Sequence, residues 1–141
     1  MASHSKQIGI IGEQVLISEF TKAGIQVLTP IGDNTPYDFV VIKDNRFVKV
    51  QVKTAEYIRD GAMTFCTSIS EPYKKITKKY TSDEVDCFGL YCIENGFIGL
   101  LPFSDYTSKD TVLRLNKPKN NQVNKIKLAE DYSFANQLNN I

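Results

Sequence analysis

The stretch "FVKVQVKTAEY" (residues 47–57) decides the fold. In a β-strand, alternate side chains point to opposite faces of the sheet. The three valines of this stretch therefore form one apolar face, as expected of a strand that packs against a core. The reverse face carries a mixed and mostly polar set: Phe47, Lys49, Gln51 and Lys53. A strand that is apolar toward the core and polar on its other side raises the question of what the polar groups bind.

The composition is that of an ordinary globular chain. Of its 141 residues, 42% are hydrophobic and 23% are charged, and a chain of this length can bury a core of its own. We therefore expect a single domain spanning residues 1–141. The apolar runs are too short to cross a bilayer, and the segment "MASHSKQIGI" (residues 1–10) lacks the apolar core of a signal peptide. These features predict a cytoplasmic location.

The cysteines and the histidine exclude several classes of site. Cys66, Cys87 and Cys92 are odd in number and lie in apolar, strand-like segments, which predicts reduced, packed thiols and no disulfide framework. His4 is the only histidine and lies near the N-terminus. A zinc site with several histidine ligands is thus excluded, as is a Ser–His or Cys–His catalytic pair held in a rigid core.

Positive charge gathers in two segments, although the formal net charge is only +1. Residues 72–80 contain four lysines and no acidic residue, and residues 111–129 contain five basic residues and again no acidic one. Such patches are typical of contacts with phosphate backbones. Chance clustering on a solvated surface is the alternative, because lysine is a common residue.

The remaining pattern predicts an α/β fold. A helix is expected from about Lys6 to Ala23, where apolar residues recur at helical spacing before Gly24. Asp44-Asn45 and residues 94–96 suit hairpin turns. Strands are expected at residues 25–30, 37–42, 47–53, 62–69, 85–93 and 97–103, with a polar tail after residue 104 and a last structured turn within residues 125–134. This order of elements predicts a sheet with the helix packed across it.

Four polar residues interrupt the apolar pattern of these elements. Glu13 lies inside the helix, Asp38 begins one strand, and Gln51 and Lys53 share one face of its hairpin partner. Each has an ordinary explanation when taken alone, such as a solvent-facing helix position or the start of a strand. All four are expected to converge, because the hairpin joins the two strands and the helix must cover them. A buried carboxylate is costly unless it is paired or bound to a metal, so the set predicts a divalent-metal site.

This order of residues resembles the PD-(D/E)XK nuclease superfamily. The matching positions are Glu13, Tyr37-Asp38 and Gln51-Val52-Lys53. Within the superfamily the chain is most similar to homing endonucleases encoded by group I introns of cyanobacteria. Residues 81–102 ("TSDEVDCFGLYCIENGFIGLLP") resemble the central hairpin of that group, and residues 118–134 ("PKNNQVNKIKLAEDYSF") resemble its closing segment. The resemblance covers nearly the whole chain and implies a restriction-endonuclease-like α/β core, in which helices flank a central mixed β-sheet.

Two positions depart from the pattern of the superfamily. The proline is Pro36, one position early, and Gln51 stands where the motif has an acidic residue. An amide oxygen can coordinate a hard cation but brings no charge, and Mg²⁺ sites commonly use one or two carboxylates together with phosphate and water. The homing branch also carries glutamine at this place, so the change is compatible with an active enzyme.

The resemblance implies Mg²⁺-dependent hydrolysis of phosphodiester bonds in double-stranded DNA, as in a site-specific homing endonuclease. Asp38 would hold the ion directly, with the Gln51 side chain and the Val52 carbonyl as further ligands. Glu13 would bind a second metal or a metal-bound water. Lys53 would orient the attacking water or stabilise the charge that develops on the phosphate.

Target recognition is expected from the two basic segments and from a symmetric assembly. A small chain reads a long DNA site economically as a homodimer or homotetramer. Candidate phosphate contacts are Lys74, Lys75, Lys78 and Lys79, and candidate base readers or further DNA contacts are Arg114, Lys117, Lys119, Asn120, Asn121 and Gln122. Two other functions stay open. One is a Holliday-junction resolvase or phage recombination nuclease, and the other is a catalytically silent DNA-binding module.

Overall fold

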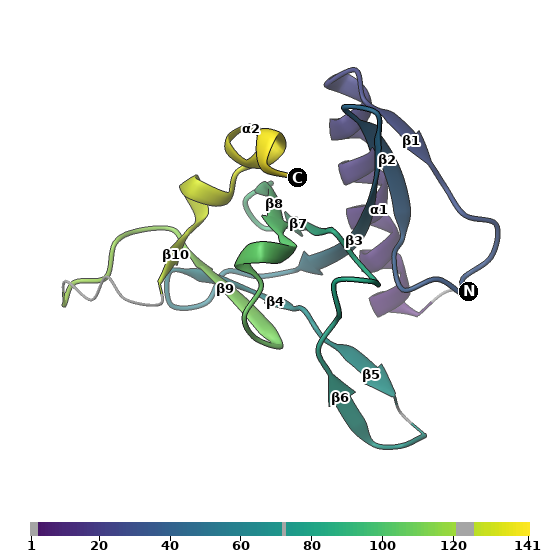
Figure 1. Ribbon diagram of the computed structural model, residues 1–141. Coiled ribbons are helices and arrows are strands. Elements are labelled where there is room, and N and C mark those ends of the chain that lie inside the picture. The colour runs from purple at the N-terminus through teal and green to yellow at the C-terminus, as the bar shows by residue number, and fades with distance from the viewer. Residues whose placement is uncertain (1–2, 72, 121–125) are drawn as a thin grey trace.

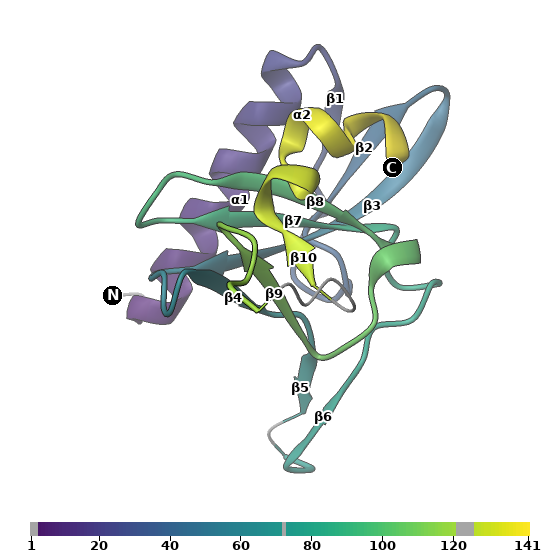
Figure 2. The same ribbon diagram turned by 90° about the vertical axis from the view of Figure 1, so that its left-hand side faces the viewer.

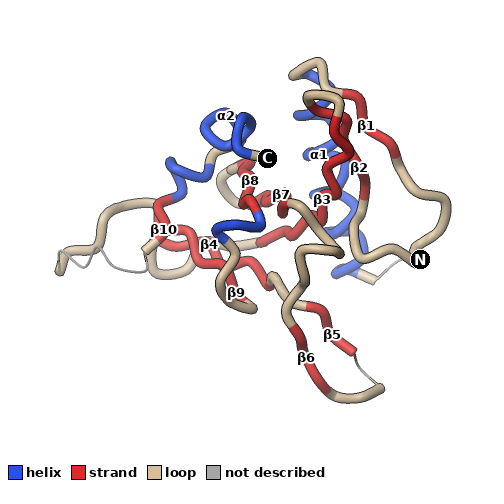
Figure 3. Tube along the Cα trace, viewed as in Figure 1, coloured by secondary structure: helices blue, strands red, loops and turns tan. Residues whose placement is uncertain are grey.

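The computed structural model describes residues 3–71, 73–120 and 126–141 (Figures 1 and 3). Its helices and strands, in chain order, are α1 (His4–Lys22), β1 (Gln26–Leu28), β2 (Phe39–Lys43), β3 (Arg46–Ala55), β4 (Ala62–Cys66), β5 (Ile69–Glu71), β6 (Ile76–Lys78), β7 (Cys87–Cys92), β8 (Ile98–Pro102), β9 (Asp110–Arg114), β10 (Lys127–Leu128) and α2 (Phe134–Gln137). Short 3₁₀ turns lie at Phe103–Asp105, Ala129–Tyr132 and Leu138–Asn140.

A five-stranded mixed sheet forms the centre of the fold, in the order β1-β2-β3-β7-β8. β2 and β3 form an antiparallel hairpin, and its turn residues Asp44 and Asn45 both have positive φ angles, of 52° and 61°. Such a turn matches the twist of the two strands it joins, and Asp and Asn tolerate the left-handed region well. β3 pairs with β7 in parallel, and β7 pairs with β8 antiparallel. The predicted α/β class with a central mixed sheet is confirmed.

The valine face of β3 is the face that α1 covers (Figure 2). Val48, Val50 and Val52 are buried in one apolar cluster with Leu16 and Phe20 of α1. Ser3 caps the helix by accepting a hydrogen bond from the backbone N–H of Lys6. Two buried glycines let the helix lie close to the sheet, because a Cβ at Gly12 would overlap Thr54 Oγ1, and one at Gly89 would lie 2.8 Å from Leu16 Cγ.

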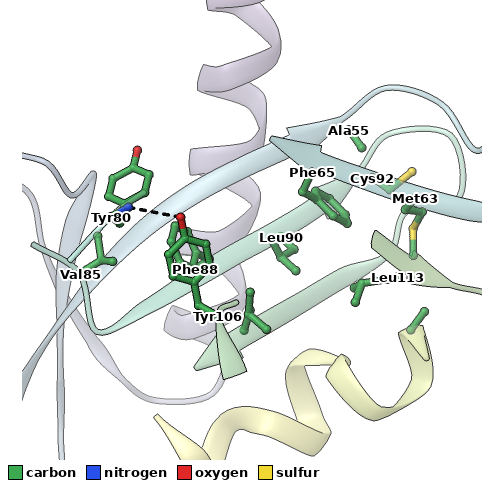
Figure 4. Packing of buried hydrophobic residues seen from close by; sticks show 12 residues of the cluster. Ala55, Met63, Phe65, Tyr80, Val85, Phe88, Leu90, Cys92, Tyr106 and Leu113 are labelled. Carbon is green, nitrogen blue, oxygen red and sulfur yellow. Dashed lines mark hydrogen bonds between the residues drawn. The ribbon is translucent and has the colours of Figure 1, made fainter. Parts of the chain in front are cut away.

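A second sheet covers the other face of the central one. β10, β9 and β4 form this three-stranded sheet, and its buried side chains pack against those of β7 and β8 (Figure 4). Phe65 of β4, Leu90 of β7 and Leu113 of β9 are fully buried there. The central sheet is therefore enclosed by α1 on one face and by strands on the other.

Several predicted bounds and environments were wrong. The strand predicted at residues 37–42 begins only at Phe39, so Asp38 directly precedes it. The segment at residues 62–69 divides into β4 and the start of β5, and the lysine-rich segment that follows contains β6. The tail after residue 104 contains β9, β10 and α2, not only one late turn.

The free cysteines follow the prediction at two of three positions. Cys87 and Cys92 are buried, whereas Cys66 is exposed, because it falls on the outward face of the alternating strand β4. Among the described helices, none has both the length and the apolar character needed to cross a bilayer.

Candidate active site

Asp38 directly precedes β2 and forms hydrogen bonds to β3 as a residue of the strand would. Its backbone N–H donates to the carbonyl of Val50 at 2.8 Å, and its Oδ2 accepts a hydrogen bond from the backbone N–H of Val52 at 2.7 Å. The carboxylate thus replaces the carbonyl that a longer β2 would have offered to β3, and it is fixed in the plane of the sheet. The N–H and C=O of one residue in an extended strand point to the same side. The Val52 carbonyl therefore faces the edge where Asp38 lies.

Glu13 reaches the same place from α1. Its carboxyl group forms a hydrogen bond with that of Asp38. Burial, the charge of Asp38 and the hydrogen bond between the two groups, in decreasing order of effect, together raise the pKa of Glu13 to about 7. A pair of close carboxyl groups cannot both ionise cheaply. Without a cation between them, Glu13 and Asp38 therefore hold a proton up to neutral pH.

The pKa of Asp38 is raised by burial, against the opposing effects of its neighbours. The Val52 N–H, the Lys53 ammonium and the hydrogen bond from Glu13 all favour the charged carboxylate. Burial of the carboxylate is the largest of these effects. A bound cation would stabilise the charged form of this buried carboxylate, because the cation compensates for the lost hydration.

Lys53 lies on the reverse face of β3, beside residues of the β4–β7 connection. Its Nζ donates to the carbonyl of Ser68 at 3.4 Å and lies 5.2 Å from the ring centre of Tyr80. Burial lowers the pKa of Lys53, whereas the charges of Cys66 and Asp38 act in the opposite direction. Lys53 thus lies within the electrostatic range of the Asp38 carboxylate.

Gln51 shares this face of β3 with Lys53. Its side chain is half-buried and makes no hydrogen bond within the part of the chain that the structure describes. Its amide oxygen is therefore not engaged by another group of the described chain. Gln51 lies in the chain between Val50 and Val52, the two β3 residues that bond to Asp38.

Two hollows adjoin these residues. One of about 270 Å³ is lined by Glu13 and Asp38 together with the β1–β2 loop, including Pro30 and Asp33. The other, of about 470 Å³, lies between the start of α1, β3 and β4, and Lys53 lines it. Glu13 and Asp38 thus line one hollow and Lys53 lines the other, whereas Gln51 lines neither of the two.

The donor set suits a hard divalent cation. Across residues 3–71, 73–120 and 126–141 there is no group of three or more His, Cys, Asp or Glu side chains that could hold a metal. Two carboxylates, one amide oxygen and one backbone carbonyl are instead the donors at this site. Mg²⁺ prefers oxygen ligands and often takes only one or two carboxylates from the protein, so the residues present fit this ion.

The predicted DNA contacts lie on two separate segments (Figure 1). The lysines of residues 72–80 belong to the hairpin β5–β6, where Lys74 and Lys78 each form a 3.1 Å ion pair with Glu71. Lys79 instead donates to the carbonyl of Thr107 at 2.8 Å. A hollow of about 660 Å³ elsewhere on the molecule is lined by Arg114, Lys117, Lys119 and Asn120. Asn121 and Gln122 lie outside the described residues.

Two side chains have surroundings that the sequence did not reveal: Tyr80 beside Lys53, and Arg114 at the separate hollow. Tyr80 is buried, as expected of a tyrosine that packs in the core. Its ring also lies against the Lys53 ammonium, which the sequence did not predict. Arg114, predicted to read bases, is half-buried, and its Nε is buried without a hydrogen-bond partner among the described residues. No spacing in the sequence indicates the Tyr80–Lys53 contact, because the two residues come from different sheet regions.

Comparison with known proteins agrees with this geometry. The sequence profile of the PD-(D/E)XK endonucleases matches residues 3–135. The solved structure of the bacterial homing endonuclease I-Ssp6803I superposes with a TM-score of 0.74 at 24% identity, over 96% of this chain and 93% of that one. The Holliday junction resolvase Hjc of Archaeoglobus fulgidus gives a TM-score of 0.47 at 16% identity, over 75% of this chain and 83% of that one.

A curated relative matches a shorter part of the chain. Protein 5.3 of Escherichia phage T7 is 43% identical over 51 residues, which are 36% of this chain and 43% of that protein. The match therefore spans less than half the length of either protein. The profile match covers nearly all of the described fold and includes every residue of the candidate active site, and the chain belongs to the PD-(D/E)XK endonuclease family.

Proposed function

We propose that the protein is a divalent-metal-dependent endonuclease that hydrolyses phosphodiester bonds in double-stranded DNA. The observation that carries the proposal is that Glu13 and Asp38 line one hollow with neighbouring carboxyl groups, with Lys53 close enough to act on the charge of Asp38. A structural carboxylate would be expected to have a fixed cationic partner or full hydration. Among the residues that the structure describes, neither carboxyl group forms an ion pair, and both line a hollow that a ligand can enter.

In this proposal each residue has a separate role in hydrolysis. Asp38, Gln51, the Val52 carbonyl and Glu13 would hold Mg²⁺, which supplies polarisation of the scissile phosphate and a lowered pKa of bound water. The backbone N–H of Val52 fixes one oxygen of Asp38 and leaves the other for the ion. Lys53 presents its ammonium to the phosphate, where a compact cation stabilises developing negative charge. Ser68 and Tyr80 hold that ammonium in place.

The finer part of the proposal is a site-specific homing endonuclease encoded by a group I intron. It is supported by the resemblance of the whole chain to that branch, including the glutamine at position 51. I-Ssp6803I, whose fold this chain shares, is itself described as a bacterial homing endonuclease. A homodimer or homotetramer would present two active sites to a symmetric DNA target.

A panel of DNA substrates tests the proposal. The protein is incubated with Mg²⁺ and with linear duplexes of random sequence, genomic DNA and four-way junctions, and the products are mapped on sequencing gels. Cleavage of genomic DNA at one or a few sites supports the homing role. Cleavage restricted to junctions would replace it with a junction-resolving role, and binding without cleavage of any substrate would leave a silent DNA-binding module.

A further inference from the structure

The hairpin β5–β6 projects away from the rest of the molecule in both ribbon views (Figures 1 and 2). We refer to residues 69–71 and 73–79 as the arm. Ser70 lies opposite Thr77 in its register, and Tyr73 beyond the strands is fully exposed. A two-stranded hairpin is at best marginally stable by itself. An element that projects and buries so little contributes little to the core, which suggests that it contacts another molecule.

The arm is strongly basic. It carries the four lysines of residues 72–80, and Lys109 approaches it with Nζ at 3.4 Å from Thr77 Oγ1. Glu71 pairs with Lys74 and Lys78 within the arm. Among the described residues, Lys75, Lys79 and Lys109 form no ion pair with a carboxylate. The charge of the arm is therefore only partly neutralised and matches a polyanion.

A buried tyrosine ties together the two ends of the arm. The Tyr106 hydroxyl donates to the carbonyl of Thr67 at 2.5 Å and accepts from the backbone N–H of Tyr80 at 3.2 Å, the latter bond being drawn in Figure 4. Thr67 also bonds through its hydroxyl to that of Thr111 at 2.9 Å. The arm is thus fixed firmly where it leaves the body.

The same two ends contact Lys53. The carbonyl of Ser68, which directly precedes the arm, accepts a hydrogen bond from Lys53 Nζ, and the ring centre of Tyr80, which directly follows the arm, lies 5.2 Å from that atom. A molecule bound at the base of the arm would therefore lie beside Lys53. This connection distinguishes the arm from the basic loop around Lys117 and Lys119, whose described residues make no recorded contact with Lys53.

We propose that the arm enters the major groove of double-stranded DNA next to the scissile phosphate. The inference rests on the proposed nuclease function and adds which element reads the substrate. A two-stranded ribbon fits the major groove, which is about 12 Å wide, and not the minor groove, which is about 6 Å wide. Ser70 and Thr77 project from one face of the ribbon and can both donate to and accept from base edges. The lysines contact the flanking phosphates.

Salt-dependent binding tests the phosphate contacts. Fluorescence anisotropy measures the affinity for a labelled duplex of about 30 base pairs in EDTA, where cleavage does not interfere. Each phosphate contact contributes about 0.9 to the slope of log affinity against log salt, so Lys75→Gln with Lys109→Gln lowers the slope by about 1.8. Lys6→Gln with Lys22→Gln on α1 removes the same charge and leaves the slope unchanged. Circular dichroism confirms that each variant is folded.

Bulky groups placed in the major groove of the DNA test whether the arm enters that groove. Glucosylated 5-hydroxymethylcytosine in the duplex places bulky groups in the major groove, and we expect the affinity of the wild-type protein to fall by about tenfold or more. Saturating the minor groove with netropsin leaves the affinity unchanged. An unchanged salt slope in the arm variant, or an unchanged affinity for the glucosylated duplex, would overturn the role of the arm while DNA binding stands. Failure of the wild-type protein to bind any duplex would overturn the nuclease proposal and the arm with it.

Discussion

Asp38 shows how one residue can serve the fold and the chemistry at once. Its Oδ2 completes the hydrogen bonding of β3 at Val52, so the fold itself fixes the orientation of the carboxylate. Glu13, Gln51 and Lys53 could be chosen from the sequence because each is a polar residue at a position that the helical or strand period assigns to a packed element. The Val52–Asp38 hydrogen bond could not be foreseen, because it depends on β2 beginning one residue after Asp38.

Substituting Gln51 tests whether its amide oxygen is a metal ligand. Gln51→Glu adds a negative charge beside Asp38, so we expect the affinity of the DNA-free protein for Mg²⁺ and Ca²⁺ to rise. Cleavage persists at a comparable or reduced rate, since a ligand oxygen remains. Isothermal titration calorimetry measures the affinity. Gln26→Glu on β1 adds the same charge at an exposed position and serves as control. Equal metal affinity in the wild type and Gln51→Glu would remove Gln51 from the site.

The raised pKa of Glu13 predicts a pH dependence of stability in EDTA. An unfolded glutamate has a pKa of 4.5 and Glu13 in the folded protein one of about 7, so the folded state binds more protons between these values. The free energy of unfolding therefore falls as the pH rises from about 4.5 to about 7. Asp38, whose pKa is also raised, acts in the same direction. Urea denaturation at a series of pH values measures the effect.

Glu13→Gln removes the titrating group and should flatten this dependence, whereas Glu130→Gln removes an exposed carboxylate near the C-terminus and should not. Adding Mg²⁺ should raise the unfolding free energy of the wild type most above about pH 7, where the carboxyl pair has lost its proton. A pH profile that Glu13→Gln leaves unchanged would show that the two carboxyl groups are not coupled.

At the scale of elements, the close contact between α1 and β3 positions Glu13. Gly12 directly precedes Glu13 and lies against Thr54, one residue after Lys53. Gly12→Ala should therefore push the helix outward, lower the free energy of unfolding by about 1–3 kcal/mol and reduce cleavage. Gly9 lies in the same helix, and a Cβ added there would meet no other atom within 4 Å. Gly9→Ala should therefore raise the free energy of unfolding by about 0.5–1 kcal/mol. Chemical denaturation measures the free energy of unfolding of both variants. Equal effects of the two substitutions would contradict the close seating of α1.

The elements that the sequence predicted well are those with a clear apolar period. α1, the hairpin β2–β3 and the hairpin β7–β8 all bury an alternating or helical set of side chains, and their turns contain Asp44-Asn45 or Gly96. β6 was missed because all three of its residues are exposed, so no apolar face marks it as a strand. β10 was missed because it has only two residues and depends on pairing with β9.

At the scale of the whole molecule, assembly is the property still to be measured. The strand at residues 98–102 is largely buried within the chain's own core and offers little apolar surface to a partner. Exposed apolar side chains lie instead around β1 and the β2–β3 hairpin, where Phe47 is 68% exposed and Ile31 fully so. We expect at least a homodimer, and multi-angle light scattering measures the mass. A monomer at micromolar concentration, both free and on DNA, would contradict this expectation.

The most direct test of the account is the cleavage of DNA by Asp38→Asn. The substitution is nearly isosteric and removes one negative charge from the centre of the carboxyl pair, so a folded variant should lose nearly all Mg²⁺-dependent cleavage. Its affinity for DNA in EDTA should be equal to that of the wild type or higher, because the wild-type carboxylate repels the phosphate that it faces. Asp60→Asn, at an exposed turn with a φ angle of 52°, removes the same charge and should cut at the wild-type rate. A folded Asp38→Asn protein that cuts DNA at nearly the wild-type rate would contradict the metal site and the mechanism built on it.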